Sequence, residues 1–93
     1  MDDLVRFWID RLDEEEAGIR DCLLSDEPNV SERDLDDVTA KRKLAQKYDE
    51  VADNDVNEPY EYAFGYANAL GEAVRLLAVV YADHPDYRTE WRP

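Results

Sequence analysis

Residues 60–82, YEYAFGYANALGEAVRLLAVVYA, decide the fold of this chain. Drawn as a helix, the segment carries apolar side chains on most of its sides. A helix that is apolar nearly all round lies at the centre of a fold or is shared with another chain. The stretch LLAVVY (76–81) has the composition of a buried strand, but it continues the helical pattern without a break. We therefore predict a helix over about 60–82.

Small residues recur every four positions in this segment, at Ala63, Ala67 and Gly71. They leave a shallow groove in which the backbone of a neighbouring helix can come close. Two interpretations follow. The groove packs inside one small bundle, or it forms the seam of a homodimer, because three helices offer few faces to cover an apolar helix.

Two further amphipathic helices are predicted upstream, over about 2–24 and about 32–52. Asp2 or Asp3 can cap the first one, and Ser31 followed by Asp34 nearly matches a capping box for the second. Loops with Asn, Asp and Pro separate the three helices. The expected fold is all-α: a single domain, 1–93, built as a small antiparallel three-helix bundle.

The last eleven residues, 83–93, carry two aromatic side chains four positions apart, Tyr87 and Trp91. On one helical turn such residues share a face. Aromatic rings can tie down a chain terminus by burying ring area while their polar edges stay wet. We predict a latch, in which this tail folds back on the helices. The alternative is that the tail binds a partner protein, because Tyr, Trp and Arg contribute much of the binding energy at interfaces.

The composition excludes several classes of function. The net charge of −13 over 93 residues repels nucleic acid and anionic membranes and attracts basic partners. The longest apolar run, 76–82, is far shorter than the roughly 20 residues of a membrane span. The N-terminus has no signal-peptide pattern, and the single cysteine, Cys22, reads as a small core residue. We expect a cytoplasmic protein without direct nucleic-acid binding.

Residues for bond-making chemistry are scarce. His84 is the only histidine, and the two serines, Ser25 and Ser31, belong to the first loop. A nucleophile and its base must lie within hydrogen-bond reach, so we expect His84 to be exposed before Pro85 and to take no part in catalysis. No calcium loop, Glu-x-x-His pair or glycine-rich phosphate loop is present. We predict no catalytic, metal-binding or cofactor-binding residue, and no enzyme.

Three segments carry a resemblance: MDDLVRFWIDRLDEEE (1–16), AKRKL (40–44) and VRLLAVVYADHPDYRTEWRP (74–93). Together they resemble a family of small uncharacterised proteins from Streptomyces, other actinobacteria and their phages. The resemblance covers roughly half of the chain, is most specific at the C-terminus and departs between 53 and 75. It implies a phage or prophage product in the cytoplasm of the bacterial host, and it implies no activity.

The leading functional hypothesis is non-enzymatic binding of a host cytosolic protein during infection, for host modulation or superinfection exclusion. The coiled-coil scaffold of polar growth is one plausible target, because an apolar helical seam can pair with a coiled coil. One alternative is an acidic DNA mimic that inhibits a nucleic-acid-binding host protein, and another is a structural homodimer. The expected contact residues are Tyr60, Tyr62, Tyr66, Tyr87 and Trp91.

Overall fold

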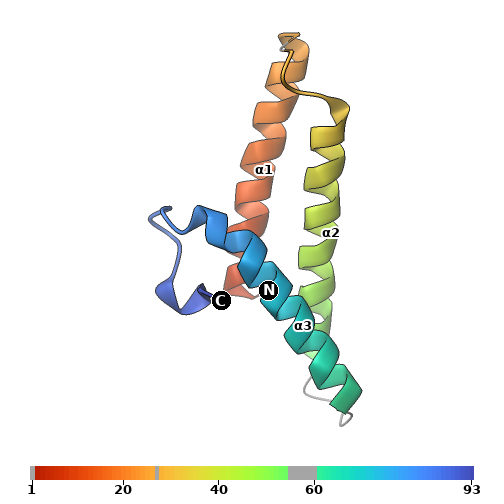
Figure 1. Ribbon diagram of the computed structural model, residues 1–93, viewed down its shortest axis with the longest axis vertical. Coiled ribbons are helices and arrows are strands. Elements are labelled where there is room, and N and C mark those ends of the chain that lie inside the picture. Colours follow the sequence, from red (N-terminus) through yellow and green to blue (C-terminus); the bar gives the residue numbers. More distant parts are fainter. Residues whose placement is uncertain (1, 27, 55–60) are drawn as a thin grey trace.

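The computed structural model describes residues 2–26, 28–54 and 61–93, with side chains for all of them except 52–54 and 61–64. The main elements are three helices, α1 (Asp3–Leu24), α2 (Glu32–Asn54) and α3 (Glu61–Ala78) (Figure 1). Short 3₁₀ turns cover Val79–Tyr81 and Thr89–Trp91. The all-α prediction is confirmed, and the described residues contain no strand.

Helices α1 and α2 form an antiparallel hairpin (Figure 1). The Asp2 carboxylate caps α1 by accepting from the backbone N–H groups of Leu4 and Val5, at 2.8 and 3.3 Å. At the start of α2 the acidic half of the predicted capping box forms, because the Ser31 N–H donates to the Asp34 carboxylate at 3.0 Å. Each bond satisfies backbone N–H groups that a helix start leaves without a partner.

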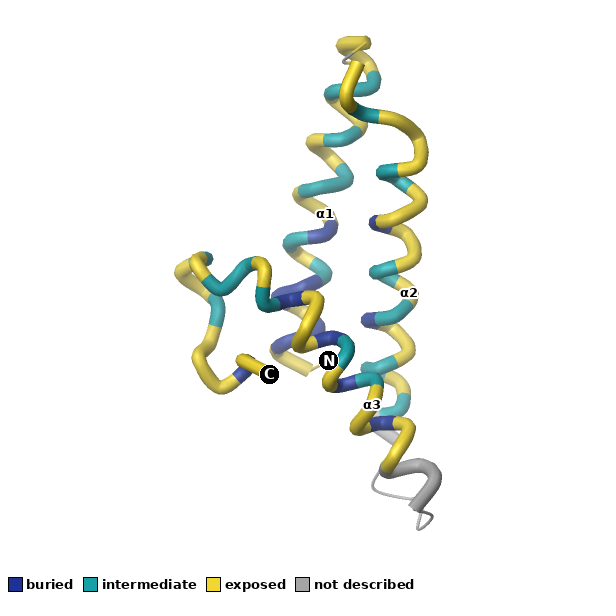
Figure 2. The backbone as a smooth tube through the Cα atoms, viewed as in Figure 1, coloured by how far each residue is buried: buried dark blue, intermediate teal, exposed yellow. Residues whose placement is uncertain are grey.

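Helix α3 crosses the half of the hairpin that holds the N-terminus, and the buried core lies at this crossing (Figure 2). The core is formed by one apolar stripe from each helix together with one residue of the tail. Its members are Leu4, Val5, Phe7, Trp8, Leu12, Val38, Ala45, Val74, Ala78 and Trp91.

The other half of the hairpin, residues 13–37, extends away from α3, and we call it the distal arm (Figure 2). None of its described residues is buried. It contains eleven acidic and two basic residues, so that −9 of the net charge of −13 belongs to it. Across its base, Arg42 of α2 pairs with Asp13 and Glu16 of α1 at 2.8 and 3.5 Å. The molecule is consequently elongated, with extents of 51 × 26 × 18 Å.

Helix α3 ends earlier than predicted, at Ala78, and tightens into the 3₁₀ turn Val79–Tyr81. Tightening of this kind is common in the last turn of a helix. It aims the Tyr81 hydroxyl at α1, where it donates to the Glu15 carboxylate. Burial and the neighbouring Glu15 carboxylate both raise the pKa of Tyr81 well above its ordinary value of 10.0. The phenol therefore stays neutral and keeps this bond at physiological pH.

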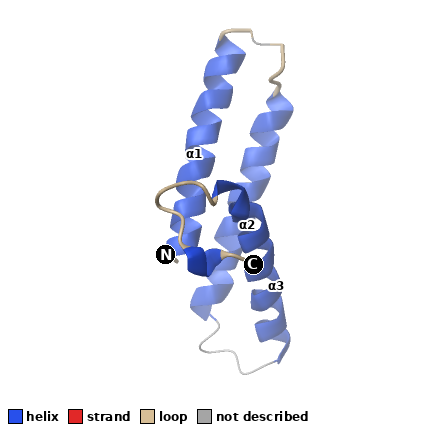
Figure 3. Ribbon diagram, turned by 60° about the vertical axis from the view of Figure 1, so that its left-hand side comes forward, coloured by secondary structure: helices blue, strands red, loops and turns tan. Residues whose placement is uncertain are grey.

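The tail returns from this turn to the first turns of α1 (Figure 3). Phe7 of α1 is the centre of the contact: its ring centroid lies 5.8 Å from that of Tyr87 and 5.2 Å from that of Trp91. Trp91 is 9% exposed. An ion pair between Arg88 and Asp3, 3.0 Å long, holds the outer edge of the tail. The predicted aromatic latch is confirmed.

Candidate functional site

The small-residue face of α3 lies against the chain's own α2. Ala67, Gly71, Val74 and Ala78 are buried. A Cβ atom at Gly71 would meet the Tyr48 ring of α2 at 3.1 Å, so glycine is what lets the ring approach. Of the two interpretations of this face, packing within one bundle is the one observed at Ala67 and Gly71. A homodimer through this face, the other interpretation, stays a prediction, and the side chain of Ala63 lies outside the described set.

A second face of α3 is apolar, and its described residues carry no charge and are partly open to solvent. Exposed fractions reach 54% at Leu76 and 74% at Val80. The row advances alternately by four and three residues, the spacing of the a and d positions of a coiled coil. We call this row the α3 seam, and its members are Tyr66, Leu70, Ala73, Leu77 and Val80. The described polar side chains of α3 lie off this row, at Asn68, Glu72 and Arg75.

An apolar row of this kind is unusual on a small soluble chain. Single exposed apolar side chains need no explanation, whereas a contiguous exposed patch marks an interaction site. Ala69 and Leu76 widen the seam along one edge. No segment in the described part of the chain covers Val80 or Leu76. The α3 seam is therefore the candidate functional site.

The structure places the predicted contact residues in different parts of the fold. Tyr66 lies on the α3 seam and is 40% exposed. Tyr87 and Trp91 belong to the latch, where their rings pack 5.6 Å apart and against Phe7. Tyr60 and the side chain of Tyr62 lie outside the described residues. Leu70, Leu77 and Val80 of the α3 seam were not among the predicted contact residues, although their spacing in the sequence already contains the four-three repeat.

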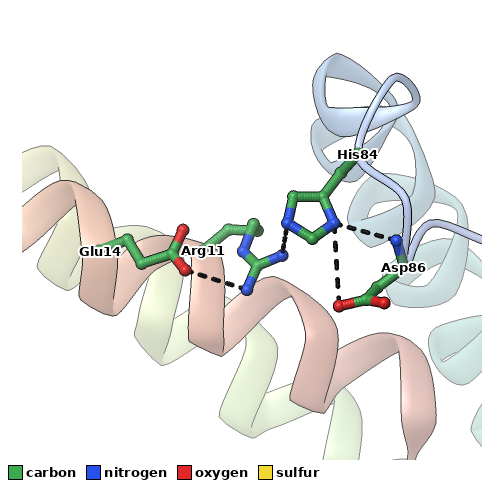
Figure 4. A network of polar contacts seen from close by, with 4 residues as sticks. All are labelled: Arg11, Glu14, His84 and Asp86. Atoms are coloured by element: carbon green, nitrogen blue, oxygen red, sulfur yellow. Dashed lines mark hydrogen bonds and ion pairs between the residues drawn. The ribbon is translucent and has the colours of Figure 1, made fainter.

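His84 differs from the expectation that it is exposed, because it is half-buried within the latch. Its ring lies edge-on to Phe7, 5.4 Å between centroids. Arg11 contacts His84 Nε2, and the Asp86 N–H donates to Nδ1 at 3.0 Å (Figure 4). Arg11 is itself held by Glu14 at 3.1 Å and by the face of the Phe7 ring. These contacts make His84 part of the tail's attachment.

Cys22 also differs from the sequence expectation: it is half-buried in the distal arm and not a core residue. Within the described residues, no group of three or more His, Cys, Asp or Glu side chains is arranged to hold a metal ion. None of the described helices has the length and apolarity needed to cross a membrane.

Comparison with known proteins places the chain in a family. The model of a family of unknown function (DUF6221) matches residues 1–93. The chain belongs to this family. The match spans the whole chain, including the segment 53–75 at which the resemblance noted from the sequence breaks off. No curated protein and no solved structure matches the chain. The function of this family is unknown, so membership in it assigns no activity to the chain.

Proposed function

We propose that the chain is a non-enzymatic binding protein of an actinobacterial phage or prophage, and that it binds a host protein in the bacterial cytoplasm. The observation that carries this proposal is the α3 seam, an uncharged apolar row on the outside of an otherwise strongly acidic chain. The origin rests on the sequence resemblance, in particular on the tail 83–93. Host modulation or exclusion of a second phage is the role that fits a small binder of this kind.

The spacing of the seam favours a helix as the bound element. Residues that repeat by four and three insert into the holes of a facing helix in a coiled coil. From Tyr66 to Leu77 the seam is about 17 Å long at 1.5 Å per residue, and Val80 follows in the 3₁₀ turn, so that the row covers about two heptads. A coiled-coil protein of the host supplies an apolar row of matching period. The scaffold of polar growth is a target of this class.

The negative charge of the chain restricts the classes of partner further. It repels nucleic acid and other acidic proteins and speeds the approach of a protein whose binding helix carries basic flanks. Glu72 and Arg75 of α3 lie away from the seam, in a hollow that they line together with Tyr48 and Gly71. Long-range attraction then comes chiefly from the distal arm.

Two substitutions on the seam test the proposal. We expect Leu77→Lys and Val80→Lys each to weaken capture of the host partner by roughly 30-fold, which corresponds to about 2 kcal/mol for a central interface residue. The measurement compares proteins retained from an actinobacterial lysate by the wild type and by each variant. A retained protein counts only if its bound segment is a helix with heptad spacing. Both sites are exposed, so thermal unfolding should be unchanged.

Leu24→Lys is the matched control, because Leu24 is 87% exposed and lies on the distal arm away from the seam. It should retain the partner. Equal capture by all variants would contradict the proposal. Sedimentation of the chain alone distinguishes binding to a host protein from homodimerisation. A wild-type dimer that Val80→Lys converts to a monomer would show that the seam pairs with a second copy of the chain.

A further inference from the structure

A second apolar surface lies on the distal arm, between α1 and α2. It is a groove of about 510 Å³, and every residue that lines it comes from positions 15–38. Ile19, Cys22, Val30 and Val38 supply its apolar lining. The groove opens at Gly18, where no atom lies within 4 Å of the position that a Cβ would take. A volume of this size falls in the range of binding clefts in general, roughly 300–1,000 Å³.

Carboxylates form the rim of this groove, from Glu15 on α1 and from Asp34 and Asp37 on α2. Asp37 is paired with Lys41 at 2.8 Å. Glu15 and Asp34 instead accept from neutral donors, the Tyr81 hydroxyl and the Ser31 N–H. Neutral donors leave the charge of a carboxylate in place. The arm, with a net charge of −9 over 13–37, therefore presents an apolar slot with two rim carboxylates, Glu15 and Asp34, that have no basic partner among the described residues.

We propose that this groove docks a basic amphipathic segment of a partner protein, with one large apolar side chain beside Gly18 and with Lys or Arg side chains next to Glu15 and Asp34. The apolar lining supplies the affinity, and the charge selects the partner, because an acidic or neutral segment would leave the rim carboxylates desolvated without a counter-charge. The groove is separate from the α3 seam, so this inference extends the proposed function and stands or falls on different residues.

Gly18 provides a matched pair of variants at one position. Gly18→Leu fills the slot, whereas Gly18→Ala leaves most of it open, and both residues are better helix formers than glycine. The probe is a labelled synthetic helix with leucine along one face and lysine and arginine elsewhere, followed by fluorescence anisotropy at about 0.15 M salt, where long-range attraction is screened. We expect Gly18→Leu to weaken binding at least tenfold and Gly18→Ala to change it less than twofold.

Two controls distinguish binding in the groove from binding by charge alone and from binding on the α3 seam. A second probe, with serine in place of each leucine, should bind the wild type and Gly18→Leu equally weakly. If the leucine probe also binds both proteins equally, charge alone attracts it, as in a DNA mimic, and the groove proposal is overturned. The variant Leu77→Lys should keep probe binding. If Leu77→Lys abolishes probe binding and Gly18→Leu does not, the probe binds on the α3 seam, and this result would also overturn the groove proposal.

Discussion

Replacing Trp91 with alanine is expected to lower the free energy of unfolding by about 3 kcal/mol, the lower end of the range for a buried tryptophan. Trp91 is 9% exposed, and its ring packs against Phe7 and Tyr87 while Arg88 covers its face at 5.3 Å. Its removal leaves a cavity between the tail and α1 and detaches the latch. Urea unfolding followed by circular dichroism gives the change directly.

The tryptophan fluorescence of the variant shows whether the helical core stays intact when the latch is detached. The chain has two tryptophans, so Trp8 is the only one left in Trp91→Ala. Its emission should stay blue-shifted, because Trp8 is 1% exposed among residues of the helices. Arg92→Ala, an exposed change in the same tail, should shift stability by less than about 0.5 kcal/mol. A Trp91→Ala protein as stable as Arg92→Ala would show that the tail contributes nothing to the fold.

Trp8→Ala should have a still larger effect, about 4 kcal/mol, because this side chain is the largest that is fully buried. A chain of this length has a total stability of roughly 5–14 kcal/mol. The variant is therefore expected to retain roughly 1–10 kcal/mol, with a midpoint in urea below that of Trp91→Ala.

In Trp8→Ala the remaining tryptophan, Trp91, reports on the latch. Phe7 and Trp8 are neighbours on α1, so we expect loss of the core and release of the tail to occur in a single transition. A tail signal that persists after helix content is lost would contradict this coupling. The smaller change Trp8→Phe keeps most of the apolar volume and should cost markedly less than Trp8→Ala.

Much of the fold follows from the sequence because its signals are local. Asp2 caps α1 and Ser31 and Asp34 form part of a capping box as predicted, since both devices depend on residues within one turn. The latch was predictable because Tyr87 and Trp91 are aromatic, closely spaced and terminal. Helix periodicity set α1 and α2 to within a few residues of their observed bounds.

The orientation of α3 could not be predicted in the same way, because it depends on a residue distant in the sequence. An all-round apolar helix gives little preference for one face, and one contact that distinguishes the faces is the Tyr48 ring, which lies 3.1 Å from the position that a Cβ at Gly71 would take. The half-buried position of His84 likewise depends on Arg11 and Phe7, more than seventy residues away. The groove on the distal arm exists because α3 crosses only half of the hairpin, a crossing that no periodicity encodes.

The central claim is that Val74, Ala78 and Leu77 of α3 and Val80 of the following 3₁₀ turn are oriented so that Val74 and Ala78 face inward and Leu77 and Val80 face outward. Thiol alkylation tests it most directly, because the chain has a single cysteine, Cys22, that serine can replace. In this background, Leu77→Cys and Val80→Cys should react nearly as fast as in the unfolded protein, and Val74→Cys and Ala78→Cys should react more than about 100-fold more slowly, since a buried thiol reacts only after local opening. Equal rates at all four positions, or a protected Val80→Cys in the monomer, would contradict the account.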